Sequence, residues 1–237
     1  SDEVLVTNGS AEANFLLVTT LVEPGDEIVV VVPNYMQIAG WARAIGATVK
    51  VVPLRESLDW QVDVDELERA VTPRTRLITL CTPNNPTGAV TPLETMHAIV
   101  DVAARHGVWL HADEVYRGSE FDADTAPSFA DLYPRAIITS GLSKAMALPG
   151  LRLGWLVGPA EELAGAWAAK DYTSITTGAL SEYIGTLVLQ PGLQTKILDR
   201  SKRMLRGNLE CLSNWLAGQN IFGLCPPRAG GMAFMSF

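Results

Sequence analysis

Short apolar runs alternate with amphipathic segments along most of the chain. Continuous apolar or β-branched runs predict buried strands, and apolar residues at helical spacing between them predict helices. The predicted strands are residues 4–6, 27–32, 47–52, 75–81, 108–112, 136–140 and 153–157. The predicted helices are residues 11–22, 36–45, 63–71, 91–106, 160–171 and 192–217. This alternation indicates an α/β fold, with a mostly parallel sheet sandwiched by helices.

The helix over 91–106 carries a start signal. Thr91 is expected to be its N-cap, with Pro92 at the first helical position and Glu94 at the third. At the far end of the chain, the segment GGMAFMSF (230–237) is expected to be the middle of a strand.

The charge balance excludes some partners. The chain has 26 acidic and 18 basic residues, a net charge of −8, which argues against nucleic acid or an anionic membrane as partner. The most apolar run, 28–33, is too short to span a bilayer, and no signal peptide is recognisable. Three widely spaced cysteines suggest reduced thiols, so we expect a cytoplasmic protein.

Polar side chains follow several of the predicted strands. In parallel sheets, ligands bind at the carboxyl ends of the strands. The segments found there are Asn8–Ala11, Thr82–Gly88 (TPNNPTG), Asp113–Tyr116 (DEVY) and the pair Ser143 and Lys144. Each has a structural alternative, a tight turn for the Asn-Pro segment and a helix N-cap for the aspartate. The four together predict a ligand site.

Two cations stand in the largely apolar stretch GLSKAMALPGLRLGW, residues 141–155. If Lys144 lies in an apolar pocket, it is readily neutral and can form a Schiff base with an aldehyde. Arg152 and an amide-rich helix start would hold a phosphate. Asp113 would bind a protonated ring nitrogen. These are the requirements of pyridoxal phosphate.

Three motifs carry a family resemblance. NNPTG at 84–88, DEVY at 113–116 and SKAMALPGLRLGW at 143–155 resemble the class I/II aminotransferases, which have the aspartate aminotransferase fold (fold type I). The resemblance covers the whole chain but only the family's large cofactor-binding domain. We therefore expect 1–237 to be that domain, truncated at both ends, and family members to be homodimers that act on amino acids.

The resemblance also implies residue roles around the cofactor ring. Lys144 would form the Schiff base and then carry the proton between Cα and C4′. Asp113 would pair with the pyridine nitrogen. Asn85 and Tyr116 would hydrogen-bond the phenolic oxygen, and Tyr35 would stack on the ring face.

At the phosphate, the resemblance implies backbone amides or a hydroxyl from Gly9, Ser10 and Ala11, with Arg152 neutralising the charge. The family usually has Ser or Thr three residues before the lysine, where this chain has Gly141. Ser140 or Ser143 is the expected replacement.

Two further segments suggest a narrower resemblance. Lys170–Thr176 (KDYTSIT) and 34–49 are similar to a bacterial subgroup that includes capreomycidine synthase and pyridoxal phosphate-dependent arginine oxidases or hydroxylases. Three functions therefore stay open. The first is an aminotransferase acting on an amino acid, the second an arginine-modifying enzyme of this subgroup, and the third a truncated, non-catalytic cofactor-binding module.

A metal site is not expected. His106, His111 and Asp113 match no zinc-ligand spacing, and no paired cysteines accompany them. We expect His111 to pack near the cofactor or the edge of the sheet.

Overall fold

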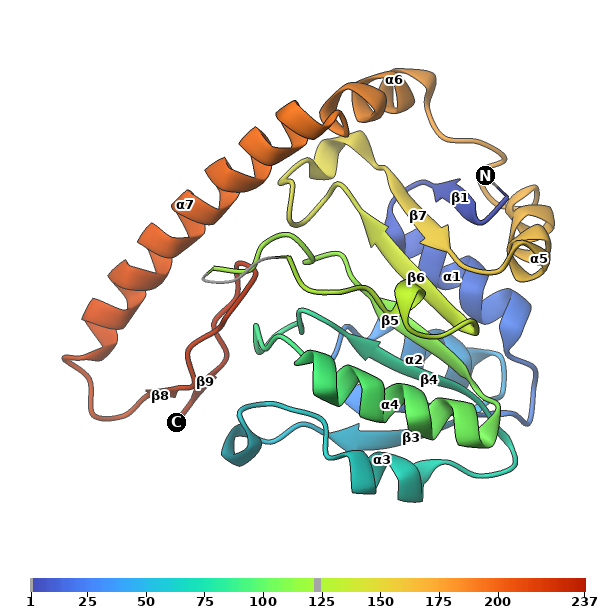
Figure 1. Ribbon diagram of the computed structural model, residues 1–237, viewed down its shortest axis with the longest axis horizontal. Coiled ribbons are helices and arrows are strands. Elements are labelled where there is room, and N and C mark those ends of the chain that lie inside the picture. Colours follow the sequence, from blue (N-terminus) through green and yellow to red (C-terminus); the bar gives the residue numbers. More distant parts are fainter. Residues whose placement is uncertain (1, 122–124) are drawn as a thin grey trace.

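A computed structural model describes residues 2–121 and 125–237 of the protein (Figure 1). Its main feature is one seven-stranded sheet with helices on both faces. The strands are β1 (Val4–Thr7), β2 (Glu27–Val32), β3 (Thr48–Pro53), β4 (Thr75–Cys81), β5 (Trp109–Asp113), β6 (Ala136–Gly141) and β7 (Gly154–Val157). The helices are α1 (Ser10–Leu21), α2 (Gln37–Ala44), α3 (Val64–Ala70), α4 (Leu93–His106), α5 (Ala160–Lys170), α6 (Ala179–Val188) and α7 (Pro191–Leu216).

The strand order is β1-β7-β6-β5-β4-β2-β3. Strands β2 to β6 run parallel, and β7 is antiparallel to both of its neighbours, β6 and β1. The predicted α/β fold with a mostly parallel sheet is confirmed, and each predicted strand forms within one or two residues of its expected bounds.

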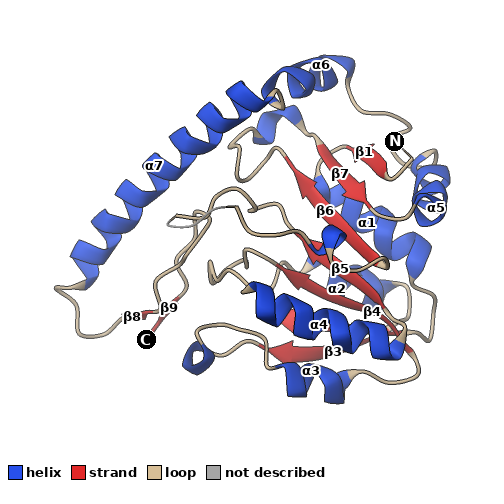
Figure 2. Ribbon diagram, viewed as in Figure 1, coloured by secondary structure: helices blue, strands red, loops and turns tan. Residues whose placement is uncertain are grey.

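Two apolar layers hold the helices to the sheet, because successive strand residues point to opposite faces. Val29 and Val31 of β2 pack with α3 and α4 on one face. Ile28 and Val30 pack with α1, α2 and α5 on the other. Figure 2 shows the strands between these two sets of helices. The carboxyl ends of β4, β5 and β6 are left open, and the candidate site lies there.

The start of α4 differs from the prediction. Pro92, not Thr91, is the N-cap, and no side chain caps the helix. The Thr91 N–H instead donates to Thr82 Oγ1 at 3.3 Å. Thr91 therefore closes the loop that follows β4 and takes no part in the helix.

Helix α6 was not predicted. It contains Gly185, and a Cβ there would stand 2.6 Å from Leu153 Cδ1, so the helix packs closely against that side chain. Beyond it, α7 extends away from the sheet, and Figure 1 shows it as a long diagonal helix. The chain ends in a small two-stranded sheet of β8 (Gly223–Leu224) and β9 (Met235–Ser236).

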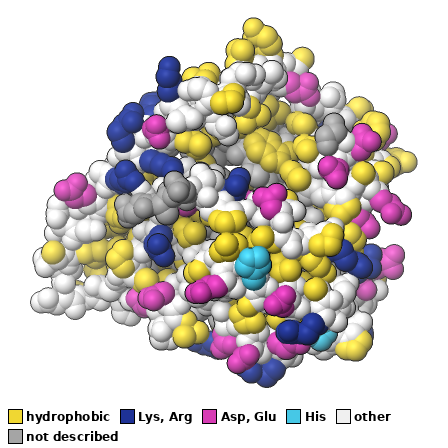
Figure 3. All heavy atoms as spheres, in the orientation of Figure 1, with side chains coloured by type: hydrophobic (Ala, Val, Ile, Leu, Met, Phe, Trp, Pro, Cys, Tyr) yellow, Lys and Arg dark blue, Asp and Glu magenta, His cyan; other side chains and the backbone are white. Residues whose placement is uncertain are grey.

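The surface carries mixed charge. On the face shown in Figure 3, basic side chains gather along α7, and acidic side chains lie among them and across the rest of this face. None of the helices in the described parts of the chain has both the length and the apolar composition needed to cross a bilayer.

Candidate cofactor site

A cavity of about 240 Å³ opens at the carboxyl ends of the central strands. Its wall is made by segments that are far apart in the sequence. The lining residues are Ser10, Ala11, Tyr35, Cys81, Asn85, Asp113, Val115, Tyr116, Ser143, Lys144, Pro149 and Arg152. The structure thus brings together every predicted site residue except Gly9 and Ser140.

Gly9 lies directly beside this cavity as the N-cap of α1, with φ of +81°. A Cβ at Gly9 would stand 2.6 Å from Nη2 of Arg152, so the guanidinium rests against the backbone of the turn. Arg152 Nη1 also donates to Pro149 O at 3.0 Å. Free amides at a helix start and a fixed guanidinium together form an anion site.

Gly154 explains how β7 approaches this helix start. A Cβ at Gly154 would stand 2.4 Å from Ser10 N, so only glycine lets β7 pass beneath the turn. Its pairing partner Gly141 is equally confined, because a Cβ there would stand 2.7 Å from Leu153 O. The absence of a hydroxyl side chain at position 141 therefore has a local steric reason.

The two serines proposed in its place are separated by the sheet. Ser143 lines the cavity, and its Oγ lies 3.5 Å from Arg152 Nη1. Ser140 points to the opposite face, where its hydroxyl donates to Glu114 O at 3.2 Å. It lines a second cavity, of about 190 Å³, together with Glu114. Ser140 therefore does not reach the predicted phosphate position.

Asp113 ends β5 and is buried beneath the cavity, 8% exposed. One carboxylate oxygen accepts the Val115 N–H at 3.2 Å. Burial raises the pKa of Asp113 to about 6, while the Val115 N–H, the side chain of Asn14 and the charge of Lys144 act in the opposite direction. A buried carboxylate with so few donors is poised to pair with a cation placed above it.

Lys144 lies at the mouth of the cavity, on the turn that follows β6. The apolar pocket considered for Lys144 from the sequence is not found, because its side chain is exposed and its neighbours include Asp113 and Arg152. Its Nζ lies 6.0 Å from the centroid of the Tyr116 ring. The amine is thus free to reach a ligand that enters the cavity.

Asn85 points into the cavity because Asn84 fixes the loop around it. The Asn84 side chain accepts from Thr87 Oγ1 at 2.8 Å and donates to Pro33 O at 3.3 Å. Gly88, with φ of +70°, leaves room for the C-terminal segment, and a Cβ there would stand 2.3 Å from Pro227 Cβ. The Asn-Pro segment is therefore both a rigid turn and part of the site.

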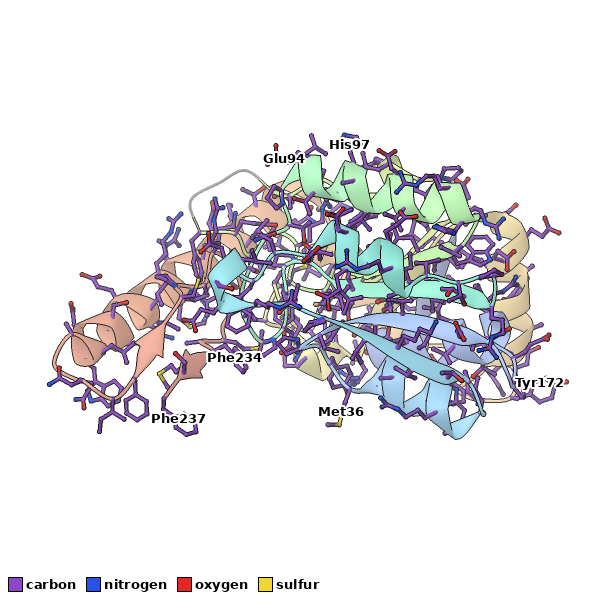
Figure 4. The ribbon with its side chains drawn as sticks, turned by 90° about the horizontal axis from the view of Figure 1, so that it is seen from below. Met36, Glu94, His97, Tyr172, Phe234 and Phe237 are labelled. Atoms are coloured by element: carbon purple, nitrogen blue, oxygen red, sulfur yellow. The ribbon has the colours of Figure 1, made fainter. Side chains whose placement is uncertain are left out.

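The two predicted tyrosines differ in setting. Tyr116 is buried, its hydroxyl lies 3.7 Å from Met232 Sδ, and burial raises its pKa further above the usual range. Tyr35 is 49% exposed and lies at the rim. Its neighbour Met36 projects away from the body (Figure 4).

His111 lies inside the sheet rather than at its edge. One ring nitrogen is 2.7 Å from Thr79 Oγ1, and the other is 3.0 Å from Thr139 Oγ1. Burial lowers the pKa of His111 to about 3. His106 pairs with Glu68 at the surface. Within residues 2–121 and 125–237, no three His, Cys, Asp or Glu side chains are grouped to hold a metal ion.

The sequence reasoning missed some lining residues. Cys81 ends β4 directly beside Asp113 in the sheet register, and it is a buried free thiol. Asn14 is buried in α1, and its side chain acts to lower the pKa of Asp113. The alternation of faces along β4 could have identified Cys81, but nothing in the local sequence relates Asn14 to Asp113.

These residues fit pyridoxal phosphate. The tight approach of Arg152 to Gly9 shapes an anion cradle at one end. The buried Asp113 carboxylate lies in the floor, and the Lys144 amine lies at the mouth. Anion cradle, carboxylate and amine are the three groups that this cofactor requires.

Comparison with known proteins gives the same family. The family model for aminotransferase class I and II matches residues 1–222. Over 183 residues, 75% of the chain, it is 40% identical to a probable N-succinyldiaminopimelate aminotransferase DapC of Mycobacterium tuberculosis, and the match spans 46% of that protein. Over 237 residues, 99% of the chain, it is 32% identical to capreomycidine synthase of Streptomyces vinaceus, and 60% of that protein is covered.

A solved structure is similar throughout. A pyridoxal phosphate-dependent aminotransferase from Streptococcus suis aligns with a TM-score of 0.93 and 30% identity, over 99% of this chain and 62% of that one. The chain thus spans about half the length of the first of these relatives and under two thirds of the others. On the family match and the shared fold, the chain belongs to the class I and II aminotransferases.

Proposed function

We propose that the chain is the large cofactor-binding domain of a pyridoxal phosphate-dependent aminotransferase that acts on an amino acid. One observation carries the proposal. The anion cradle at Gly9, the buried carboxylate of Asp113 and the amine of Lys144 all border one cavity. When bound, pyridoxal phosphate supplies an electron sink for negative charge at the substrate Cα.

The side chains of the cavity would then have distinct tasks. Lys144 would hold the cofactor aldehyde and move the proton at the substrate Cα. Asp113 would keep the ring nitrogen protonated, and Asn85 and Tyr116 would bind the phenolic oxygen. Tyr35 would cover the ring face from the rim.

At the other end of the cavity, the amides of Ser10 and Ala11 would bind the phosphate. Arg152 would neutralise its charge, and Ser143 would add a hydroxyl. Gly9 would contribute by letting the guanidinium approach the turn.

A second candidate is an arginine-modifying enzyme of the same cofactor class. It is favoured by the similarity to capreomycidine synthase, which runs along 99% of the chain and includes the Lys170–Thr176 segment. For either candidate function, the proposal includes that the protein is a homodimer and that it is cytoplasmic. Exposed apolar side chains at Tyr172, Ile175, Leu180 and Tyr183 support a partner chain on this side.

An absorption titration tests the proposal. The chain is mixed with pyridoxal phosphate and then with a panel of amino acids that includes arginine. A near-visible band that one amino acid converts to the spectrum of the pyridoxamine form supports amino transfer. Oxygen uptake with arginine supports the second candidate. If no band forms at any cofactor concentration, the proposed function is overturned.

A further inference from the structure

Lys170, the last residue of α5, is a buried lysine that the proposed chemistry does not use. It is 2% exposed. Its ammonium donates to Ser174 Oγ at 2.7 Å and lies 3.8 Å from Glu12 Oε2. Tyr172, two residues later, is 91% exposed and projects from the body in Figure 4. A buried cation requires a compensating partner, which here is Glu12.

Glu12 lies in the first turn of α1, and its carboxylate fixes the turn that begins the helix. Oε2 accepts the Asn8 N–H at 2.7 Å, and Oε1 accepts from Thr173 Oγ1 at 2.8 Å. Asn8 Nδ2 donates to Thr176 O at 3.2 Å. The segment after α5 is therefore fastened to the same turn, Asn8–Ala11, that borders the cavity.

This arrangement creates an electrostatic conflict at the anion cradle. Burial raises the pKa of Glu12, but bonds from Asn8, Ser174 and Thr173 and the charge of Lys170 outweigh it, so the net shift is downward. The carboxylate is therefore ionised, which stabilises the helix start. The same charge repels any anion bound to the amides of that turn. A cation behind the carboxylate removes this repulsion.

We propose that Lys170 is a positioning residue for the phosphate end of the site. Its ammonium offsets the Glu12 carboxylate, so that the Asn8–Ala11 turn keeps its anchoring carboxylate and still accepts a phosphate monoester. This inference rests on the proposed function. It adds a residue that lies outside the cavity wall and acts only through Glu12.

The alternative is that Lys170 only ties the end of α5 to the segment that follows. The two roles differ in one respect. A structural tie affects every ligand of the cavity, whereas charge compensation affects only ligands that carry the phosphate. Pyridoxal, which lacks the phosphate, is therefore the matched probe for pyridoxal phosphate.

The experiment measures the affinities of both probes for the full chain by absorption titration at low salt. The variants are Lys170→Met, Glu12→Gln and the two combined. Lys196→Met, which removes an exposed lysine of α7, is the control for net charge. In Lys170→Met, affinity for pyridoxal phosphate should fall about fivefold relative to pyridoxal, as expected for one uncompensated charge near the surface. The combined variant should regain the parent ratio, and added salt should shrink the difference.

Glu12→Gln alone keeps an acceptor for the Asn8 N–H and leaves Lys170 as an excess cation. It should bind pyridoxal phosphate at least as tightly as the parent does. If Lys170→Met fails to fold, this variant alone tests the inference. An equal loss for both probes, no recovery in the combined variant, or a selective loss in Glu12→Gln overturns the inference. If the parent chain binds pyridoxal but not pyridoxal phosphate, the inference fails; if it binds neither, the proposed function itself fails.

Discussion

The guanidinium of Arg152 and the backbone of Gly9 are in such close contact that no side chain fits between them. A Cβ at Gly9 would stand 2.6 Å from Nη2. Two segments that lie far apart in the sequence thus form one anion cradle. Gly154 makes this arrangement possible, because it lets β7 pass beneath Ser10 N.

Gly9→Ala should weaken both the fold and the cradle. The backbone has φ of +81°, and the new methyl displaces Arg152. We expect a loss of about 1–2 kcal/mol in the free energy of unfolding, from the positive φ. Affinity for pyridoxal phosphate should fall as well. Urea unfolding and absorption titration measure the two effects.

Gly25→Ala is the matched control, since Gly25 has φ of +94° and a Cβ added there would meet nothing within 4 Å. It should lose stability but keep cofactor affinity. Equal affinities in the two variants would contradict the role given to Gly9.

Lys144→Ala should abolish covalent capture of the cofactor. In the parent, borohydride treatment after incubation with pyridoxal phosphate should fix the cofactor mass on the peptide that contains Lys144. Peptide mass spectrometry locates the adduct. Lys196→Ala should leave labelling unchanged, and a stoichiometric adduct that persists in Lys144→Ala would assign the amine elsewhere.

Asp113→Asn should stabilise the ligand-free chain at neutral pH. Because burial raises the pKa of Asp113 from 3.8 to about 6, the folded chain binds more protons than the unfolded chain between these values. This contribution to stability is present below pH 4 and is lost as the pH rises through 6. The asparagine variant does not lose this free energy of unfolding, which amounts to about 3 kcal/mol in the parent.

Urea unfolding of both proteins at pH 4, 6 and 8 checks this, and the difference between them isolates Asp113 from other groups. The same variant should bind pyridoxal phosphate more weakly, because a neutral amide does not hold the ring nitrogen protonated. A variant that is less stable than the parent at pH 8 would argue against the buried, poorly compensated carboxylate.

His111→Gln should flatten the acid side of the stability profile. Burial lowers the pKa of His111 from 6.5 to about 3, so only the unfolded chain takes up its proton between these values. Stability is therefore lost as the pH falls below 6.5, at about 1.4 kcal/mol per pH unit from this group. Unfolding measurements at pH 4 to 7 should show a shallower slope in the variant, and parallel profiles would refute the assignment.

Much of the fold follows from the local sequence. Runs such as Ile28–Val31 are buried on both faces, so their composition alone indicates parallel strands. The positions of the strand ends were also sufficient to predict which residues form the site. Residues that directly follow parallel strands lie at the same edge of the sheet. That is why Asn85, Asp113 and Lys144 meet at one cavity.

What the sequence did not predict depends on packing between distant residues. The local sequence does not tell which of Ser140 and Ser143 faces the cofactor cavity. The structure shows that the two serines line different cavities, Ser140 the smaller one and Ser143 the cofactor cavity. Helix α6 packs Gly185 against Leu153, a contact that local propensity does not reveal. Lys144 is exposed because its turn carries it beyond the apolar end of β6.

The pairing of β1 with β7 has a consequence for how the protein is made. Val4 pairs with Val157, so the first strand of the seven-stranded sheet joins it through the last of the seven to be synthesised. Contacts between residues so far apart in the sequence form late, because closing the large loop between them costs conformational entropy before the contact stabilises the chain. During synthesis the Asn8–Ala11 turn emerges before Arg152 and β7, and it can meet Arg152 only when that later segment has left the ribosome. Cofactor capture by a nascent chain would therefore mark the moment at which the sheet is complete.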